Sequence, residues 1–157
     1  MNLKFDHITT QVRVDSRDDA IRAAAAPLLA AGKITPDYID AVIDRENEFP
    51  TGLPAALGVA IPHADPEQVL EEGISIVTLE NPVIFHGMVA PEEKIEVYLL
   101  FFLAIKDGAS QVEILQQIVS IIQDEMVLHK IKDAKSTEKV YNLLNELRHE
   151  EERKFDL

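Results

Sequence analysis

The amino-acid sequence predicts an α/β protein in which helices pack on a mixed β-sheet. Segments with helix caps fill the first third of the chain, β-branched segments the middle, and apolar stripes at helical spacing the last third. Such a sheet needs helices on it to bury its apolar side chains. The chain has 157 residues, 46% of them hydrophobic, as is typical of one globular domain. We therefore expect a single domain over residues 1–157, with a frayed, charged tail at 148–157.

The first elements along the chain are a strand and a helix. Residues 5–14 place apolar side chains among polar ones, which favours a strand. Ser16 can cap a helix whose first turn carries acidic residues, where they suit the helix dipole. Helix formers continue over residues 20–31, and Gly32 is placed to end the helix. Pro27 falls inside this helix and predicts a kink or an early break.

A second helix is predicted from Thr35 to about Asn47. Thr35 supplies a capping hydroxyl, and Pro36 suits the first helical position. Apolar residues at helical spacing follow on one face: Ile39, Val42 and Ile43. The next segment, residues 49–54, contains two prolines and a glycine, so we expect no regular structure there.

Four segments in the middle of the chain are expected to form most of the sheet. Residues 58–62 form a short strand stopped by its proline, and residues 74–79 form a longer β-branched strand. Residues 83–85 can add a third short strand. Residues 95–105 are too apolar for a surface strand, so we place them in the centre of the sheet, buried on both faces.

Helices are expected to complete the chain. Residues 110–123 carry apolar side chains at helical spacing, residues 126–131 can form a short turn of helix, and Ser136 can cap a last helix. The apolar stripe of that last helix comprises Val140, Leu143, Leu144 and Leu147.

The composition excludes several kinds of partner and site. The 15 Lys and Arg residues stand against 28 Asp and Glu, which gives a formal net charge of −13. Nucleic-acid phosphates and anionic lipids are bound through Lys and Arg, so we expect neither as a partner. The absence of Cys excludes disulfides, thiolate zinc sites and cysteine nucleophiles. The longest apolar run, Val97–Ile105, is short of the roughly 20 residues of a membrane span, and no signal-peptide pattern is present. We expect a cytoplasmic protein that does not insert into the membrane.

The negative charge is distributed unevenly. Between Asp65 and Glu96, eight acidic residues and the single base Lys94 give a charge of −7. This segment is either a solvated surface that keeps the protein soluble or a face that accepts basic partners.

Four of the five histidines are interpreted as surface or structural residues: His7, His86, His129 and His149. No pair of histidines has the spacing of metal ligands on one helix. His63 and Asp65 could supply two ligands, but a third is not evident. We therefore expect no metal and no cofactor.

The setting of His63 favours phosphoryl chemistry. His63 follows a strand that ends in Pro62, a place where side chains project from a sheet edge. The proline- and glycine-rich loop upstream offers backbone amides to an anion, and Arg45 lies near the end of the preceding helix. A neutral imidazole is a nucleophile near pH 7, and an arginine with amides can hold phosphoryl oxygens. From these residues alone, a structural role for His63 stays open.

Two stretches of the chain resemble a known family. Residues 45–53 read Arg-Glu-Asn-Glu-Phe-Pro-Thr-Gly-Leu, and residues 58–65 read Gly-Val-Ala-Ile-Pro-His-Ala-Asp. In this order they resemble the signature of enzyme IIA of the fructose/mannitol type. This enzyme belongs to the phosphoenolpyruvate-dependent sugar phosphotransferase system of bacteria. A looser similarity extends over almost the whole chain.

The resemblance implies a three-layer α/β/α fold with a mixed sheet, and a phosphocarrier function. His63 would accept a phosphoryl group, through Nε2, from the histidine-containing phosphocarrier protein. It would pass the group to a cysteine of the cognate IIB component. Arg45 would bind phosphoryl oxygens and orient the histidine. A membrane partner, the IIC component, would recognise the sugar, so this chain would bind sugar weakly or not at all.

Gln111 marks a departure from the family pattern. Many members carry a second histidine at this place, opening a later helix and facing the first. Gln111 can donate a hydrogen bond to a phosphoryl oxygen but supplies no positive charge. The alternative is a solvated helix position. Glutamine here, together with Phe-Pro-Thr-Gly-Leu-Pro and Asn-Pro-Val, is most similar to the galactitol-type subgroup.

Three functions remain compatible with the residues. The first is a phosphocarrier for sugar or polyol uptake, and the second is a regulatory domain whose His63 phosphorylation controls binding to a non-transport protein. The third is a structural scaffold, as in cytoplasmic domains of anion transporters, which the presence of both Arg45 and His63 disfavours. Three apolar residues would form a docking rim around the site or belong to the core: Phe49, Leu53 and Leu57.

Overall fold

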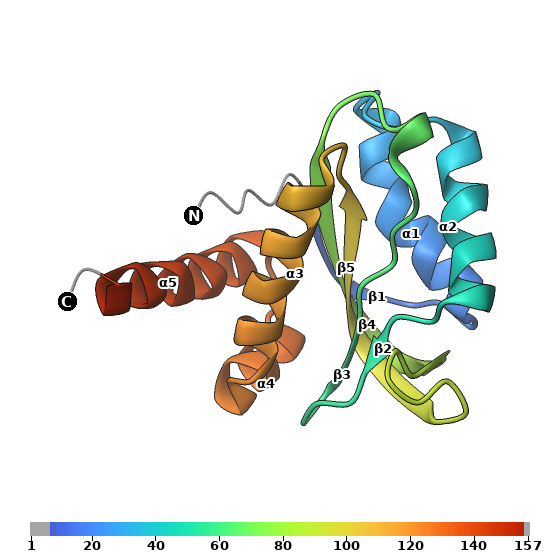
Figure 1. Ribbon diagram of the computed structural model, residues 1–157. Helices are drawn as coiled ribbons and strands as arrows, with labels where there is room; N and C mark the ends of the chain where they lie inside the picture. The colour runs from blue at the N-terminus through green and yellow to red at the C-terminus, as the bar shows by residue number, and fades with distance from the viewer. Residues whose placement is uncertain (1–6, 156–157) are drawn as a thin grey trace.

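A mixed five-stranded sheet forms the centre of the protein, with helices on both of its faces (Figure 1). The computed structural model describes the backbone of residues 7–155 and the side chains of residues 7–146. The strand order is β1-β4-β5-β3-β2. Helices α1 (Arg17–Ala30) and α2 (Pro36–Glu48) cover one face. Helices α3 (Gly108–Ile122), α4 (Glu125–Asp133) and α5 (Thr137–Phe155) cover the other. The predicted three-layer α/β/α fold is confirmed.

The sheet combines parallel and antiparallel pairs around a buried central strand. Strand β1 (His7–Val12) runs parallel to β4 (Gly73–His86), which pairs antiparallel with β5 (Lys94–Ala104). Strand β3 (Gly58–Ala60) runs parallel to β5, and β2 (Gly52–Leu53) pairs antiparallel with β3. Because β5 is the third strand in the order, its predicted central position is confirmed.

Successive side chains of β5 point to opposite faces of the sheet, as in any extended strand. Leu100 and Phe102 pack in the cluster that contains α1 and α2. Phe101 and Leu103 pack in the cluster that contains α3, α4 and α5. From Leu99 to Ala104 the strand has no solvated face, which explains its apolar sequence there, whereas Lys94 and Glu96 at its start are exposed.

Two predictions about the sheet are wrong. The loop 49–54 contains a short strand, β2, which lies at the edge of the sheet, where a proline in the next position is tolerated. The segments 74–79 and 83–85 belong to one strand, β4, with a shift in register between Thr78 and Val83. The proline of this stretch sits in the irregular part, where the missing N–H costs no ladder hydrogen bond.

The first two helices begin at the predicted caps. The Ser16 hydroxyl accepts a hydrogen bond from the backbone N–H of Asp19 at 3.1 Å, and Thr35 accepts one from Tyr38 at 3.3 Å. Helix α1 runs through Pro27 to Ala30, so the predicted early break does not occur. Gly32 follows with φ of 74°, a left-handed conformation that glycine adopts without strain.

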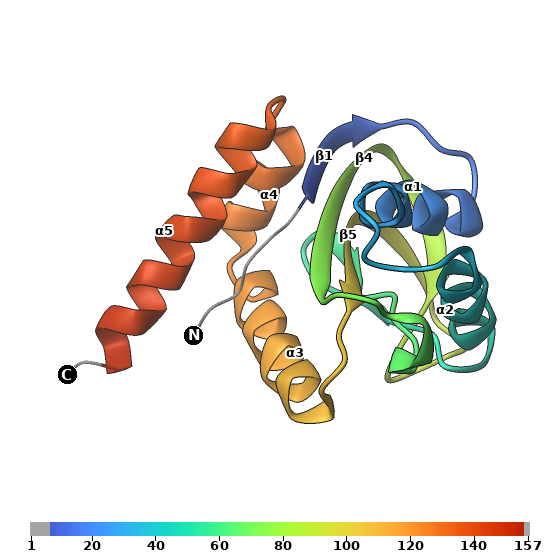
Figure 2. The same cartoon turned by 90° about the horizontal axis from the view of Figure 1, so that it is seen from above.

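The three C-terminal helices form one layer along one side of the sheet (Figure 2). Ser136 caps α5 as predicted, since its hydroxyl accepts from the N–H of Lys139 at 3.2 Å. Leu147, at the end of the predicted stripe, lies outside the described side chains, and residues 5, 6, 156 and 157 lie outside the described backbone. Helix α5 reaches Phe155, and fraying of residues 148–157 stays a prediction. Within residues 7–155, every helix is too short or too polar to span a membrane.

Gly58 allows β3 to approach β5 closely. A Cβ atom at this position would collide with the backbone carbonyl oxygen of Glu96, which cannot move without disrupting β5. The pairing of β3 with β5 sets the direction in which the chain leaves β3. That departing segment carries His63.

Candidate functional site

The backbone on both sides of His63 is held by hydrogen bonds to neighbouring elements. In Figure 1, the segment after β3 runs along the sheet toward the end at which β5 finishes. The N–H of Leu103 in β5 donates to the carbonyl of Pro62 at 3.0 Å. The N–H of Ala64 donates to the hydroxyl of Tyr38 in α2 at 3.3 Å. His63 therefore sits on a segment that is fixed to both the sheet and α2.

Tyr38 is a buried link between α2 and this segment. Its hydroxyl accepts from Ala64 and donates to the carbonyl of Leu103 at 2.6 Å. Burial raises the pKa of Tyr38 to about 12, so the hydroxyl keeps its proton at neutral pH. Both hydrogen bonds of the link are therefore present under ordinary conditions.

The imidazole of His63 is oriented by the carbonyl of Ile61. Its Nδ1 atom lies 2.7 Å from this oxygen, and the residue is only 8% exposed. A carbonyl oxygen can only accept a hydrogen bond, so Nδ1 must carry the proton and the lone pair of the neutral ring lies on Nε2.

The surroundings of His63 favour this neutral ring. Burial lowers the pKa of His63, and the positive charge of Arg45 lowers it further. The hydrogen bond to Ile61 and the charge of Asp65 act in the opposite direction but do not reverse the shift. A neutral imidazole with a free Nε2 lone pair is a nucleophile at neutral pH.

Arg45 places a positive charge beside this segment. It lies in the last turn of α2, and its guanidinium group lies 5.2 Å from the centre of the Phe49 ring. Its Nη1 atom is 3.7 Å from a carboxylate oxygen of Asp65, longer than a hydrogen bond. Its Nε atom is buried without a hydrogen-bond partner. The donors of Arg45 are therefore not saturated by protein groups and can bind an anion.

A surface pocket of about 400 Å³ borders Arg45 and the segment after His63. Four carboxylate side chains line it together with the guanidinium: Asp44, Glu48, Asp65 and Glu67. Arg45 is the one cationic residue of this lining. The rim of the pocket is therefore negative except at the guanidinium of Arg45.

Gln111 lies in the first turn of α3, partly buried. Its backbone N–H donates to the carbonyl of Asp107 at 3.0 Å. Helix α3 starts shortly after β5 ends, which places Gln111 at the same end of the sheet as His63. Among the described residues, no hydrogen bond or ion pair joins Gln111 to His63 or Arg45.

The three apolar residues considered for a docking rim differ in burial. Phe49 is 55% exposed beside Arg45. Leu53 and Leu57 are partly buried and pack against the core cluster of the α3–α5 face. Phe49 is thus available to a partner, whereas the other two pack against the core.

The other histidines lie apart from this arrangement. His86 is exposed, and its Nδ1 donates to the carbonyl of Pro91 at 2.7 Å. His129 is exposed on α4, His7 is partly buried on β1, and His149 lies outside the described side chains. Within the described part of the chain, no three side chains of the kinds that bind metals gather in one place.

Sequence reasoning missed two buried residues next to the site. The N–H and the hydroxyl of Thr51 donate to one carboxylate oxygen of Glu46 at 2.8 Å and 3.0 Å, and the same hydroxyl accepts from the N–H of Ile61 at 3.2 Å. Glu46 follows Val42 and Ile43 at helical spacing, on the apolar face of α2. A carboxylate on an apolar face was the signal that could have revealed this pair.

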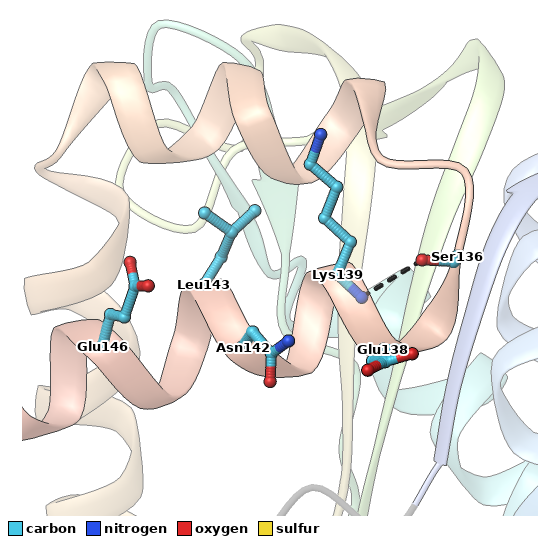
Figure 3. A pocket seen from close by; sticks show the side chains of 6 residues that line it. All are labelled: Ser136, Glu138, Lys139, Asn142, Leu143 and Glu146. Atoms are coloured by element: carbon cyan, nitrogen blue, oxygen red, sulfur yellow. Dashed lines mark hydrogen bonds between the residues drawn. The ribbon is translucent and has the colours of Figure 1, made fainter.

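A second surface pocket, of about 320 Å³, lies on α5 (Figure 3). Six side chains line it: Ser136, Glu138, Lys139, Asn142, Leu143 and Glu146. None of them is a residue of the site predicted from the sequence.

Comparison with known proteins identifies the family of the chain. The ascorbate-specific PTS system EIIA component of Salmonella choleraesuis (strain SC-B67) is 28% identical over 140 residues, 88% of each chain. The crystal structure of IIA mannitol from Escherichia coli has 25% identity and a TM-score of 0.77, covering 92% of this chain and 99% of that one.

A second similar structure is the complex of enzyme IIAMtl with phosphorylated enzyme IIBMtl from Escherichia coli. It has 23% identity and a TM-score of 0.76, with 92% of this chain and 97% of that one covered, and it shares the fold. Residues 1–147 match the family model described as "Phosphoenolpyruvate-dependent sugar phosphotransferase system, EIIA 2". With its three-layer fold and this match over most of its length, the chain belongs to the type 2 EIIA family and is a phosphotransferase component of the sugar phosphotransferase system.

Proposed function

We propose that the chain is a phosphocarrier that accepts a phosphoryl group on Nε2 of His63 and passes it on. The donor is the histidine-containing phosphocarrier protein, and the acceptor is a cysteine of the cognate IIB component. One observation carries this proposal. The Nδ1–H of the buried His63 donates to Ile61, which leaves Nε2 as the nucleophilic atom of a ring that the charge of Arg45 influences.

The transfer needs no other chemistry from the chain. The Nε2 lone pair forms the bond to phosphorus while the bond to the donor's histidine nitrogen breaks and its electron pair returns to that nitrogen. His63 keeps its Nδ1 proton throughout, so the phosphorylated ring is positively charged. In the second step the thiolate of the IIB cysteine forms a bond to phosphorus, and the N–P electron pair returns to Nε2 of His63. The positive ring is a good leaving group, which suits onward transfer.

Arg45 is proposed to bind the phosphoryl oxygens during both steps. In the transition state of transfer, the phosphoryl group carries charge on its equatorial oxygens. Catalysis therefore consists of positioning this group and stabilising its charge. Arg45 has free donors and is the one cation lining the neighbouring pocket. We propose that Gln111, at the same end of the sheet, donates one further uncharged hydrogen bond.

The surface around the site suits partners with basic docking faces. The pocket rim carries four carboxylates, and Phe49 offers an exposed apolar contact beside them. Complementary charge accelerates encounter and is screened by salt. We propose both the phosphocarrier protein and IIB as such partners, with sugar recognition left to the membrane component IIC. For IIB, the complex of IIAMtl with phosphorylated IIBMtl supports the proposal through its shared fold.

The transported compound is proposed to be a sugar or polyol. Similar proteins include components named for ascorbate and for mannitol. The galactitol-type assignment that Gln111 favours stays a prediction. Uptake of labelled galactitol, mannitol and ascorbate by cells with and without the gene would decide among them.

The test of the proposal is phosphorylation in a reconstituted system. The chain is incubated with phosphoenolpyruvate, enzyme I and the phosphocarrier protein, and its intact mass is measured. We expect one acid-labile phosphate, which is lost in His63→Ala and retained in His86→Ala and His129→Ala. Uptake of the phosphate by His63→Ala would overturn the assignment. Phosphorylation without onward transfer to the cognate IIB would instead favour the regulatory function.

A further inference from the structure

We propose that Glu46 and Thr51 are positioning residues for His63, and that they act through the backbone of Ile61. The proposal rests on the function of His63 as the phosphoryl acceptor. Glu46 binds Thr51, and Thr51 binds the N–H of Ile61, whose carbonyl accepts the hydrogen bond from the imidazole.

A continuous series of buried hydrogen bonds connects Glu46 to His63. Glu46 is 2% exposed and Thr51 is 2% exposed. The Glu46 carboxylate accepts from Thr51, the Thr51 hydroxyl accepts from the N–H of Ile61 at 3.2 Å, and the carbonyl of Ile61 accepts from Nδ1–H of His63 at 2.7 Å. Ile61 is thus held at its N–H by Thr51, while its carbonyl holds the ring.

Glu46 determines which way the Thr51 hydroxyl is oriented. A hydroxyl has one proton and can donate only once. The two oxygens of Glu46 lie 3.0 Å and 2.9 Å from the Thr51 hydroxyl oxygen and can accept its proton, whereas the N–H of Ile61 cannot. The proton of Thr51 is therefore committed to Glu46, which leaves a lone pair directed at the N–H of Ile61. Without Glu46 the hydroxyl could rotate and release Ile61.

The sequence explains why a carboxylate is tolerated in this buried position. Helix α2 ends at Glu48, and the chain turns back so that Thr51 meets the helix it has just left. Two donors of Thr51 reach the carboxylate. A buried carboxylate that has lost water needs such donors, and leaving it unpaired would be costly. The two donors of Thr51 would be enough to stabilise the buried carboxylate of Glu46. The Thr51 hydroxyl also accepts from the N–H of Ile61, and the carbonyl of Ile61 accepts from His63.

The position of the Ile61 carbonyl matters for both transfer steps. It fixes the proton on Nδ1 and so presents Nε2 as the free lone pair for the incoming phosphoryl group. It also keeps that proton on the ring after phosphorylation, when the positive ring is the leaving group. A loosened carbonyl allows the other tautomer, in which Nε2 carries the proton and cannot attack phosphorus.

The decisive variant is Thr51→Val, which has nearly the same shape but lacks the hydroxyl. We expect a lower population of the Nδ1–H tautomer of His63, observed in ring ¹⁵N NMR shifts of the full chain. We also expect phosphoryl transfer slower by about tenfold, the effect of losing one buried hydrogen bond. Thr51→Ser restores the hydroxyl and should recover both the tautomer and the rate.

Thr78→Val is the matched control for Thr51→Val. Thr78 is also a buried threonine, and its hydroxyl also accepts a backbone N–H, that of Gln11 at 2.9 Å. It lies on β4 and serves β1, at the opposite edge of the sheet from β2. The control should lose comparable stability without changing the tautomer of His63 or the rate of transfer.

Glu46→Gln provides a second route to the same answer if Thr51→Val does not fold. It keeps one acceptor oxygen, so we expect a smaller change in the same direction for tautomer and rate. The proposal is overturned if folded Thr51→Val or Glu46→Gln keeps the tautomer population of the unmodified chain. It is also overturned if Thr78→Val slows transfer as much as Thr51→Val. Failure of the unmodified chain to take up phosphate would refute the proposed function instead, and the NMR comparison would still decide whether Thr51 orients the ring.

Discussion

The two helical layers pack on one sheet but differ in what they bury. The α1–α2 layer contributes the buried carboxylate of Glu46 and the buried hydroxyl of Tyr38, and both bond to the segments that lead to His63. In the described part of α3, α4 and α5, the one buried polar side chain is Gln117, and the core cluster of this face is apolar.

This difference places the buried polar groups near His63 in one layer and mainly apolar packing in the other. Buried polar groups are tolerated only with partners, and those of the α1–α2 layer bond to the residues on both sides of His63, the proposed phosphoryl acceptor. The opposite layer supplies apolar packing and, through the start of α3, Gln111. We therefore expect that removing a buried apolar side chain of the α3–α5 layer lowers stability and leaves transfer unchanged, whereas removing the charge of Arg45 in α2 slows transfer and leaves stability nearly unchanged.

The largest expected effect is on stability, in the apolar layer. Leu144 of α5 is 2% exposed in the core cluster. Leu144→Ala should lower the free energy of unfolding by about 2–5 kcal/mol, because it removes buried surface and leaves a cavity. Urea denaturation measures this loss. Below the midpoint the folded variant should still be phosphorylated at the unmodified rate. A folded Leu144→Ala variant with an altered His63 tautomer would break the comparison.

The next effect is on chemistry, in the polar layer. Arg45→Ala should slow phosphoryl transfer roughly 10²-fold, because the one cation lining the pocket is lost. Its side chain is 33% exposed, so the thermal midpoint should change little. Single-turnover transfer from the phosphorylated phosphocarrier protein measures the rate.

Arg22→Ala is the control for Arg45→Ala. Arg22 also belongs to this layer and pairs with Asp19 at 3.4 Å on the exposed face of α1. Removing its charge should leave the rate unchanged. Equal slowing by the two variants would mean that net charge, not the position of Arg45, controls transfer.

The smallest effect is a shift in pH dependence. Burial and the charge of Arg45 lower the pKa of His63, so the neutral ring should persist below pH 6.5 and transfer should continue there. The unfolded chain binds this proton more readily than the folded one. The contribution of His63 to stability therefore declines as pH falls below about 6.5, down to the folded pKa.

The contribution of Glu46 to stability is expected to have the opposite pH dependence. Burial raises its pKa, so its contribution to stability is largest at low pH and declines as pH rises through the folded pKa. Titration of the His63 ring by NMR, in the unmodified chain and in Arg45→Ala, tests the first shift. Arg45→Ala should raise the pKa of His63, and a folded value at or above 6.5 in the unmodified chain would contradict the lowering.

Much of the fold was predictable because its signals are local. Caps at Ser16, Thr35 and Ser136 and the apolar run of β5 each act within one element, and all were found in place. The joining of residues 74–79 and 83–85 into β4 was not predictable, since a neighbouring strand pairs with both parts across the proline. His63 and Arg45 were singled out as site residues by their chemistry and by the resemblance.

The sequence by itself determined the family, the layers and the residues that could react, because these depend on residue type and on spacing along the chain. Only the tertiary structure decided which nitrogen of His63 carries the proton, because that depends on the carbonyl of Ile61 and on its surroundings. It also decided that Thr51, which bonds to Glu46, accepts the hydrogen bond from the N–H of Ile61. Hydrogen bonds require distances of about 3 Å, and separations along the chain do not specify them.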